Sequence, residues 1–140
     1  MKYFLSNFKK NAIKANSILK EKGFTLDFTG YDATITEYVN MLEEDIYSNK
    51  KLAIELNFWA NYMSETINIV IFFKNMIIDE LDYLNALENK DEELKKQIKL
   101  KEKQIKLLKQ FINILESQKN FFEKAFYHTR KNLKKEIFLD

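Results

Sequence analysis

The chain has 140 residues, of which 46% are hydrophobic and 31% charged, a composition that fits one folded domain and excludes a disordered chain. Its formal net charge is +2, and it contains no cysteine, which excludes disulfides, thiolate metal sites and cysteine nucleophiles. Proline is absent and glycine occurs only at Gly23 and Gly30, so little interrupts helix formation. We therefore expect an all-α protein.

The first predicted helix covers residues 2–22. Apolar residues recur there at helical spacing, at Phe4, Phe8, Ala12, Ala15 and Leu19. Gly23 is a natural stop for this helix, because glycine accepts the left-handed conformation that often ends helices. Residues 24–31 alternate like a strand but have no second strand to pair with. We predict a loop whose aromatic side chains pack under the helices.

The second and third helices are predicted over residues 34–48 and 50–88. Thr34 followed by Glu37 matches a capping box at the start of the second helix. Ser48 and Asn49 include neither glycine nor proline, so the sequence leaves open whether these two helices are continuous. Asp91 is a candidate N-cap for a fourth helix over residues 91–138.

The fourth helix shows a heptad pattern typical of coiled coils. Its two heptad positions hold Ile98, Ile105 and Ile112, and Leu94, Leu108, Leu115 and Phe122. A short turn between two long helices predicts an antiparallel hairpin. We therefore expect residues 1–140 to form a single domain: an elongated helical bundle built on a long antiparallel coiled-coil hairpin, with two shorter N-terminal helices.

A second apolar stripe lies about 100° around the fourth helix. It includes Leu100, Leu107, Phe111, Ile114 and Phe121. One interpretation is that the first two helices cover this stripe, and the other is that it forms an oligomer interface. Two short helices are not expected to cover the whole hairpin, so the sequence favours a homo-oligomer, with a dimer preferred.

Charge is segregated along the chain. Residues 1–22 carry six lysines against one glutamate, and residues 94–140 carry thirteen basic residues against five acids. Residues 23–93 carry fifteen acids against four lysines. The lysines of residues 95–109 are expected to be neutralised across the hairpin by acids at the end of the third helix, including Glu80. The candidate phosphate contacts are therefore Lys9, Lys10, Lys14, Arg130, Lys131, Lys134 and Lys135.

No residue set predicts catalysis. His128 is the only histidine, no glutamate lies three residues before it, and no glycine-rich phosphate loop is present. Consecutive acids on a helix point in different directions and do not converge on a cation. We expect no enzyme activity, no catalytic or metal site and no cofactor.

A membrane partner is disfavoured. The apolar window 66–78 is shorter than the roughly 20 residues of a bilayer span. An amphipathic membrane-surface helix at Phe4, Leu5 and Phe8 is the weakest candidate. Residues 1–10 lack the pattern of a secretory signal, and with the lack of cysteine this predicts a cytoplasmic location.

The functional hypothesis is a non-enzymatic protein-interaction module, acting as scaffold, adaptor or inhibitor through its helical surfaces, as a homo-oligomer or with an unidentified protein partner. The alternative is a sequence-nonspecific nucleic-acid-binding protein that uses the two basic termini. Twenty-two of the 23 basic residues are lysine, as AT-rich coding would produce, which weakens lysine counts as an argument for function. This composition is typical of small phage and mobile-element proteins.

Overall fold

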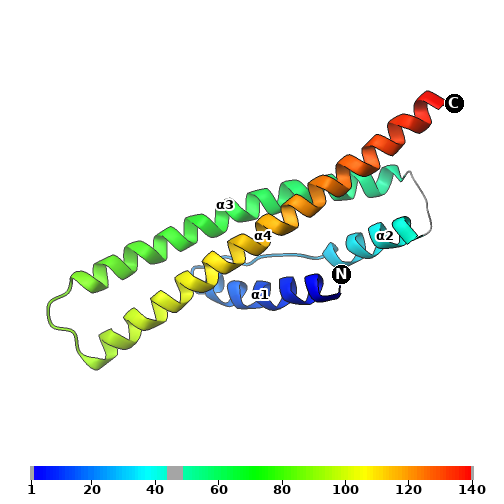
Figure 1. The fold of residues 1–140 in the computed structure, drawn as a ribbon. Helices are drawn as coiled ribbons and strands as arrows, with labels where there is room; N and C mark the ends of the chain where they lie inside the picture. The colour runs from blue at the N-terminus through cyan, green and yellow to red at the C-terminus, as the bar shows by residue number, and fades with distance from the viewer. Residues whose placement is uncertain (1, 44–48, 140) are drawn as a thin grey trace. The chain divides into compact units, whose positions relative to one another are not determined.

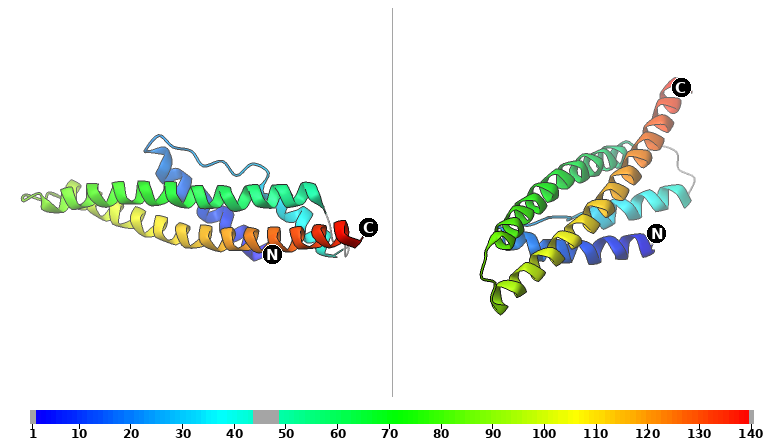
Figure 2. Two further views of the ribbon diagram at one scale, coloured as in Figure 1. Left: turned by 90° about the horizontal axis from the view of Figure 1, so that it is seen from above. Right: turned by 60° about the vertical axis from the view of Figure 1, so that its left-hand side comes forward.

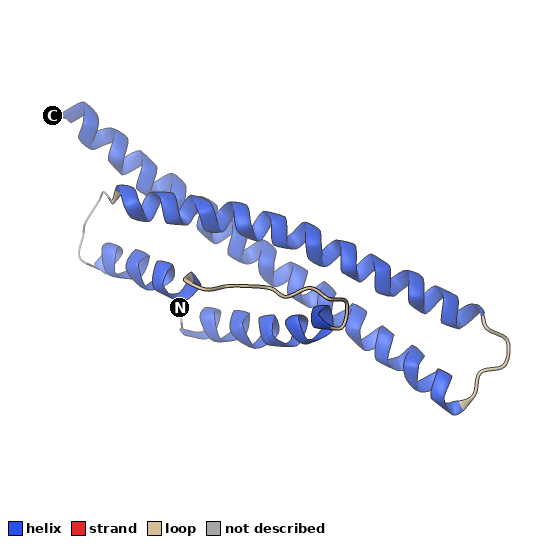
Figure 3. Cartoon of the chain, turned by 180° about the vertical axis from the view of Figure 1, so that it is seen from behind, coloured by secondary structure: helices blue, strands red, loops and turns tan. Residues whose placement is uncertain are grey.

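Four helices make up most of the chain in the computed structural model, which describes residues 2–43 and 49–139, with side chains from 6 to 43 and from 49 to 130. In chain order they are α1 (Lys2–Lys20), α2 (Tyr31–Glu43), α3 (Lys50–Ala86) and α4 (Glu92–Leu139) (Figure 1). The remaining described residues form loops and turns, and none forms a strand (Figure 3). The all-α prediction is confirmed.

The two long helices pack against each other as an antiparallel helical hairpin (Figure 1 and Figure 2). The predicted cap of α4 is present, since the Asp91 side chain accepts a hydrogen bond from the backbone amide of Leu94 at 2.8 Å. The heptad positions of α4 are buried at Ile105, Leu108, Ile112, Leu115 and Phe122. Burial of this stripe supplies the hydrophobic driving force for the hairpin.

α1 ends where Gly23 was predicted to stop it. Gly23 has φ +81°, and its backbone amide donates to the carbonyl of Lys20 at 3.0 Å. The amide of Phe24 donates to the carbonyl of Leu19, also at 3.0 Å, which completes the paired hydrogen bonds of a Schellman motif. A Cβ at this position would meet no atom within 4 Å, so the backbone conformation alone favours glycine here.

α2 begins earlier than the capping-box pattern predicted. Its first residue is Tyr31, and the carbonyl of Gly30 accepts the amide of Thr34 at 3.1 Å. Gly30 has φ +91°, so it ends the preceding loop and opens the helix. The prediction of a cap at Thr34 is wrong, because the Thr34 hydroxyl is buried inside the helix and donates to the Gly30 carbonyl at 3.2 Å.

α2 and α3 are separate helices. α2 ends at Glu43 and α3 begins at Lys50, and the predicted end of the second helix, residues 44–48, lies outside the described residues. The Asn49 side chain caps α3 by accepting the amide of Leu52 at 3.0 Å. The predicted ends at residues 22 and 88 differ from the observed ends by two residues each.

The chain forms two compact units, each built from parts of the long helices. Unit 1 comprises Met1–Leu26 and Thr66–Leu115, and unit 2 comprises Asp27–Glu65 and Glu116–Asp140. The prediction of one domain stays a prediction, since α3 and α4 each contribute to both units. The two units are described separately below.

In unit 1, α1 packs against the hairpin through small and apolar residues. Its buried positions are Phe8, Ala12, Ala15, Ile18 and Leu19, which share one helix face. The predicted loop follows α1, and its Phe24 ring packs on Phe73 of α3 with centroids 5.6 Å apart. Leu26 is buried, and its amide donates to the Asn16 side chain at 2.8 Å.

Unit 2 has an aromatic core. The Trp59 ring meets Tyr31 edge-on at 5.7 Å and stacks on Phe122 at 6.3 Å. The buried Tyr31 hydroxyl donates to the side-chain oxygen of Gln118, so its one polar group is satisfied. Burial, with a contribution from the Asp32 charge, raises the pKa of Tyr31, which therefore stays a neutral donor. The loop residue Phe28 packs edge-on against Tyr62 in this unit.

Candidate interaction groove

An open groove runs between α1 and α4 within unit 1. Its lining extends from Ile13 of α1 to Glu21, just after the end of that helix, and on α4 from Leu100 to Leu107. The lining positions on each side alternate between spacings of one and three residues, as residues of one helix face do. The groove has a volume of about 420 Å³. It spans about two turns of each helix.

The centre of the groove is apolar, and its edges expose two large aliphatic side chains. Ile18 is buried and Leu107 half-buried within it. Ile13 is 72% exposed and Leu100 54% exposed, one on each side. A fully buried Leu or Ile side chain contributes about 1.5–3 kcal/mol relative to an exposed one. Covering these two side chains would therefore provide a substantial part of a binding free energy.

Lysines border the groove on both helices. Lys14 on α1 and Lys103 on α4 line it and are exposed. At the end of the groove near the α1 C-terminus, the amide of Gln104 donates to the carboxylate of Glu21 at 3.3 Å. The charged residues that line the groove are therefore two lysines and one glutamate, with the glutamate at one end.

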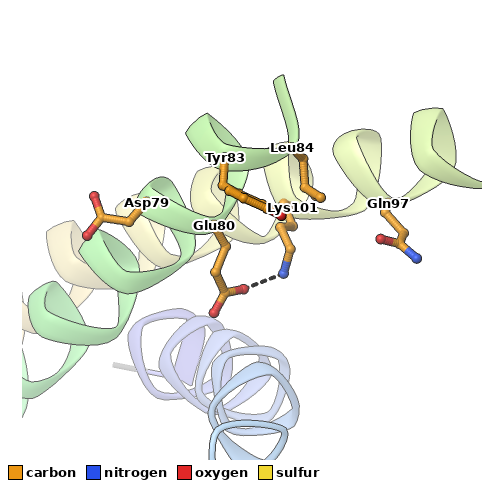
Figure 4. Close-up of a pocket in the computed structure, with 6 residues that line it drawn as sticks. All are labelled: Asp79, Glu80, Tyr83, Leu84, Gln97 and Lys101. Carbon is orange, nitrogen blue, oxygen red and sulfur yellow. Dashed lines mark hydrogen bonds and ion pairs between the residues drawn. The ribbon is translucent and has the colours of Figure 1, made fainter. Parts of the chain in front are cut away.

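A three-residue ionic cluster fixes α1 to the hairpin. Lys22 donates to one oxygen of the Glu80 carboxylate, and Lys101 of α4 donates to the other. Figure 4 shows Glu80 and Lys101 pointing toward each other, while Asp79 points away. Burial raises the pKa of Glu80, but the two lysine hydrogen bonds outweigh burial and lower it overall. The cluster therefore joins the turn after α1 to both α3 and α4 in unit 1.

Lys101 and Glu80 also line a second hollow, between α3 and α4 of unit 1. Its other lining residues are Asp79, Tyr83, Leu84 and Gln97, and its volume is about 430 Å³ (Figure 4). The pairing of Lys101 with Glu80 agrees with the expected neutralisation across the hairpin. The participation of Lys22, from the turn after α1, was not expected from the sequence.

The five predicted interface residues have different surroundings. Leu100 and Leu107 line the groove. Phe111 is only 1% exposed and packs on Phe8 of α1, with ring centroids 6.2 Å apart. In unit 2, Phe121 is half-buried and meets Tyr38 of α2 edge-on at 5.7 Å. α1 and α2 thus cover parts of the stripe, which agrees with the interpretation that the first two helices pack on it. Ile114, the fifth residue, is half-buried.

The predicted phosphate contacts are exposed where their side chains are described. Lys9, Lys10 and Lys14 are exposed on α1 in unit 1, and Arg130 is exposed on α4 in unit 2. The side chains of Lys131, Lys134 and Lys135 lie outside the described residues. Phe8, predicted for a membrane-facing helix, is buried, while Phe4 and Leu5 also lie outside the described side chains.

Sequence reasoning missed Ile13, Ser17 and Ile18 as groove residues. Ile13 follows Ala12 directly, so it lies about 100° off the apolar face of α1. Single exposed aliphatic residues are common on protein surfaces, so Ile13 alone could not have predicted a groove. The groove itself carries no sequence signal, since it depends on how closely α1 and α4 approach each other.

No protein family, curated protein or solved structure matches this chain. Among the residues that the structure describes, no group of three or more His, Asp or Glu side chains could hold a metal ion. Within the same residues, no helix is both long enough and apolar enough to cross a membrane.

Proposed function

We propose that this chain is a non-enzymatic protein-interaction module that binds a helix of a protein partner in the groove between α1 and α4. The observation that supports the proposal is the apolar groove itself, with exposed Ile13 and Leu100 on opposite sides. An amphipathic helix recognises such a groove with apolar anchors at positions i, i+3 or i+4, and i+7.

The dimensions of the groove fit this mode of binding. The α4 side extends from Leu100 to Leu107, which at 1.5 Å per residue is roughly 10 Å, or two helical turns. A partner helix would place two or three anchors over this length. The bordering Lys14 and Lys103 favour a partner with acidic residues beside those anchors.

A site-specific photocrosslink tests the proposal, because the natural chain has no cysteine. Ser17 lines the groove and Ser117 lies exposed on α4 in unit 2, so Ser17→Cys and Ser117→Cys are a matched pair for labelling with a thiol-reactive photocrosslinker. Each labelled protein is irradiated in an extract of its native host. The expected result is protease-sensitive adducts from position 17 that are absent from position 117.

The specificity control is Leu100→Glu added to the Ser17→Cys chain. It places a charge at the edge of the groove without touching the buried core, so the adducts should disappear while the helical circular dichroism signal is unchanged. Equal adducts from both positions, or adducts that survive Leu100→Glu, would contradict the proposal.

Nucleic-acid binding is the second candidate, because Lys9, Lys10 and Lys14 are all exposed on one helix. The same crosslinking experiment separates it from the first. Adducts that are removed by nuclease, and that are lost when Lys9, Lys10 and Lys14 are replaced by glutamine, would put nucleic-acid binding first.

A further inference from the structure

The exposed side of α3 in unit 1 carries aromatic rings and negative charges, whereas the groove is bordered by lysines. Phe72 is 60% exposed and Tyr83 is 67% exposed. At 100° per residue, Phe72, Asp79 and Tyr83 lie within about 40° of one another around the helix. Asp79 is exposed on this face, and Asp82 is exposed about 60° further around the helix from it. We call Phe72, Asp79, Asp82 and Tyr83 the acidic ridge.

The acidic ridge and the groove are complementary in charge and in apolar content. The groove exposes Ile13 and Leu100 and is lined by two lysines and one glutamate, whereas the ridge exposes two aromatic rings and two aspartates. The ridge spans twelve residues, a rise of roughly 16 Å, which is enough to fill a groove of about 10 Å. Opposite charges on the two surfaces would orient the encounter and speed association.

From this complementarity we infer that the groove binds the acidic ridge of a second copy of this chain. The inference rests on the proposed function and names the partner of the same groove. Lys99 and Lys96 lie on α4 about one and two turns before Lys103, and both are exposed. A ridge helix in the groove would place Asp79 and Asp82 near these lysines while its aromatic rings cover Leu100 and Ile13.

The contact is head-to-tail. The groove is lined by α1 and α4 and the ridge belongs to α3, so the two surfaces in one contact are different. Each bound pair then keeps one unused groove and one unused ridge, and such a contact propagates to rings or filaments. Association therefore grows with protein concentration and weakens with salt, because exposed charges are screened.

A mixing experiment with two blocked variants tests the inference. Leu100→Glu blocks the groove and leaves the ridge, while Phe72→Glu blocks the ridge and leaves the groove; both positions are exposed. Mass is measured by sedimentation velocity over a range of concentrations, at about 50 mM and about 500 mM salt. The control is Tyr127→Glu, an exposed aromatic position in unit 2.

The expected pattern is specific to a head-to-tail contact. The natural protein and Tyr127→Glu form species larger than one chain at low salt, and each blocked variant alone stays at 16.8 kDa. The mixture of the two variants forms a species of twice that mass and grows no further, because the ridge of one fills the groove of the other. Circular dichroism of each variant checks that it is folded.

Two outcomes overturn the inference. One is a natural protein that stays at 16.8 kDa at all concentrations, and the other is a mixture that stays monomeric although the natural protein associates. Adducts from Ser17→Cys to foreign proteins, together with a monomeric natural protein, would keep the proposed function and overturn this inference. A lack of specific protein adducts in the extract, including self-adducts, would contradict the proposed function instead.

Discussion

The two units of this chain are both built from helices, but they differ in how they bury their apolar side chains. In unit 2 the large aromatic side chains pack on one another, and the polar atom of Tyr31 is satisfied inside the core. In unit 1 the α1 helix contributes alanines to the core, and Ile13 and Leu100 are left exposed beside a groove. The difference teaches that large aromatic rings fill the core of unit 2, whereas the smaller core side chains of α1 leave an open groove beside α4 in unit 1.

The largest difference in stability between the two units is expected for Trp59→Ala compared with Leu100→Ala. Trp59 is buried among Tyr31 and Phe122, so its truncation should lower the free energy of unfolding by about 3–5 kcal/mol. Leu100 is more than half exposed, so its truncation should change that free energy by less than about 0.5 kcal/mol while weakening association. Urea unfolding and sedimentation measure the two effects. Equal stability effects at the two positions would remove the contrast between the units.

A smaller effect is expected from Tyr31→Phe in the core of unit 2. The substitution keeps the ring but removes the hydroxyl that donates to Gln118. The buried amide oxygen then loses its partner, and the free energy of unfolding should fall by about 1–3 kcal/mol. Tyr83→Phe in unit 1 is the matched control, because Tyr83 is exposed and water can replace its hydrogen bonds. Urea unfolding of both variants at neutral pH checks this prediction, and equal effects would contradict it.

The ionic cluster of unit 1 predicts a pH dependence. The pKa of Glu80 is lowered in the folded protein, so its contribution is present above the unfolded pKa of about 4.3 and is lost as pH falls through the folded pKa. Glu80→Gln should lower the free energy of unfolding at pH 7 by at most about 1 kcal/mol, since the group is partly exposed to solvent. The difference from the natural chain should vanish below the folded pKa.

Glu102→Gln is the matched control for this cluster, because Glu102 is exposed on α4 one residue after Lys101. Its unfolding free energy should follow that of the natural chain over the same pH range. If Glu80→Gln and the natural chain stayed equally different at acid and neutral pH, the loss would come from packing and not from the charge of Glu80.

Local sequence rules predicted the fold where the cause is local. Gly23 ends α1 and Asp91 caps α4, because each needs only its own backbone conformation or side chain. The heptads of α4 predicted its buried stripe for the same reason. The capping-box rule failed at Thr34. The pattern is present in the sequence, but it lies inside a helix that begins directly after Gly30.

The candidate site was only partly predictable. Leu100 and Phe111 belong to one stripe, yet Phe8 covers Phe111 while Leu100 remains exposed, and this difference depends on where α1 crosses α4. Periodicity within one helix carries no information about that crossing point. The same limit applies to Lys22, which reaches a glutamate 58 residues away.

The smallest expected effect concerns the charges that pair groove and ridge. Lys103→Glu and Asp79→Lys should each weaken self-association by a few tenths of a kcal/mol to about 1 kcal/mol, since exposed ion pairs contribute little. The two substitutions in the same chain restore opposite charges across the contact, so association should recover toward that of the natural protein. Sedimentation at low and high salt measures this cycle. If the losses of association free energy were additive in the double variant, these two charges would not be in contact. The acidic partner of the groove would then be another protein.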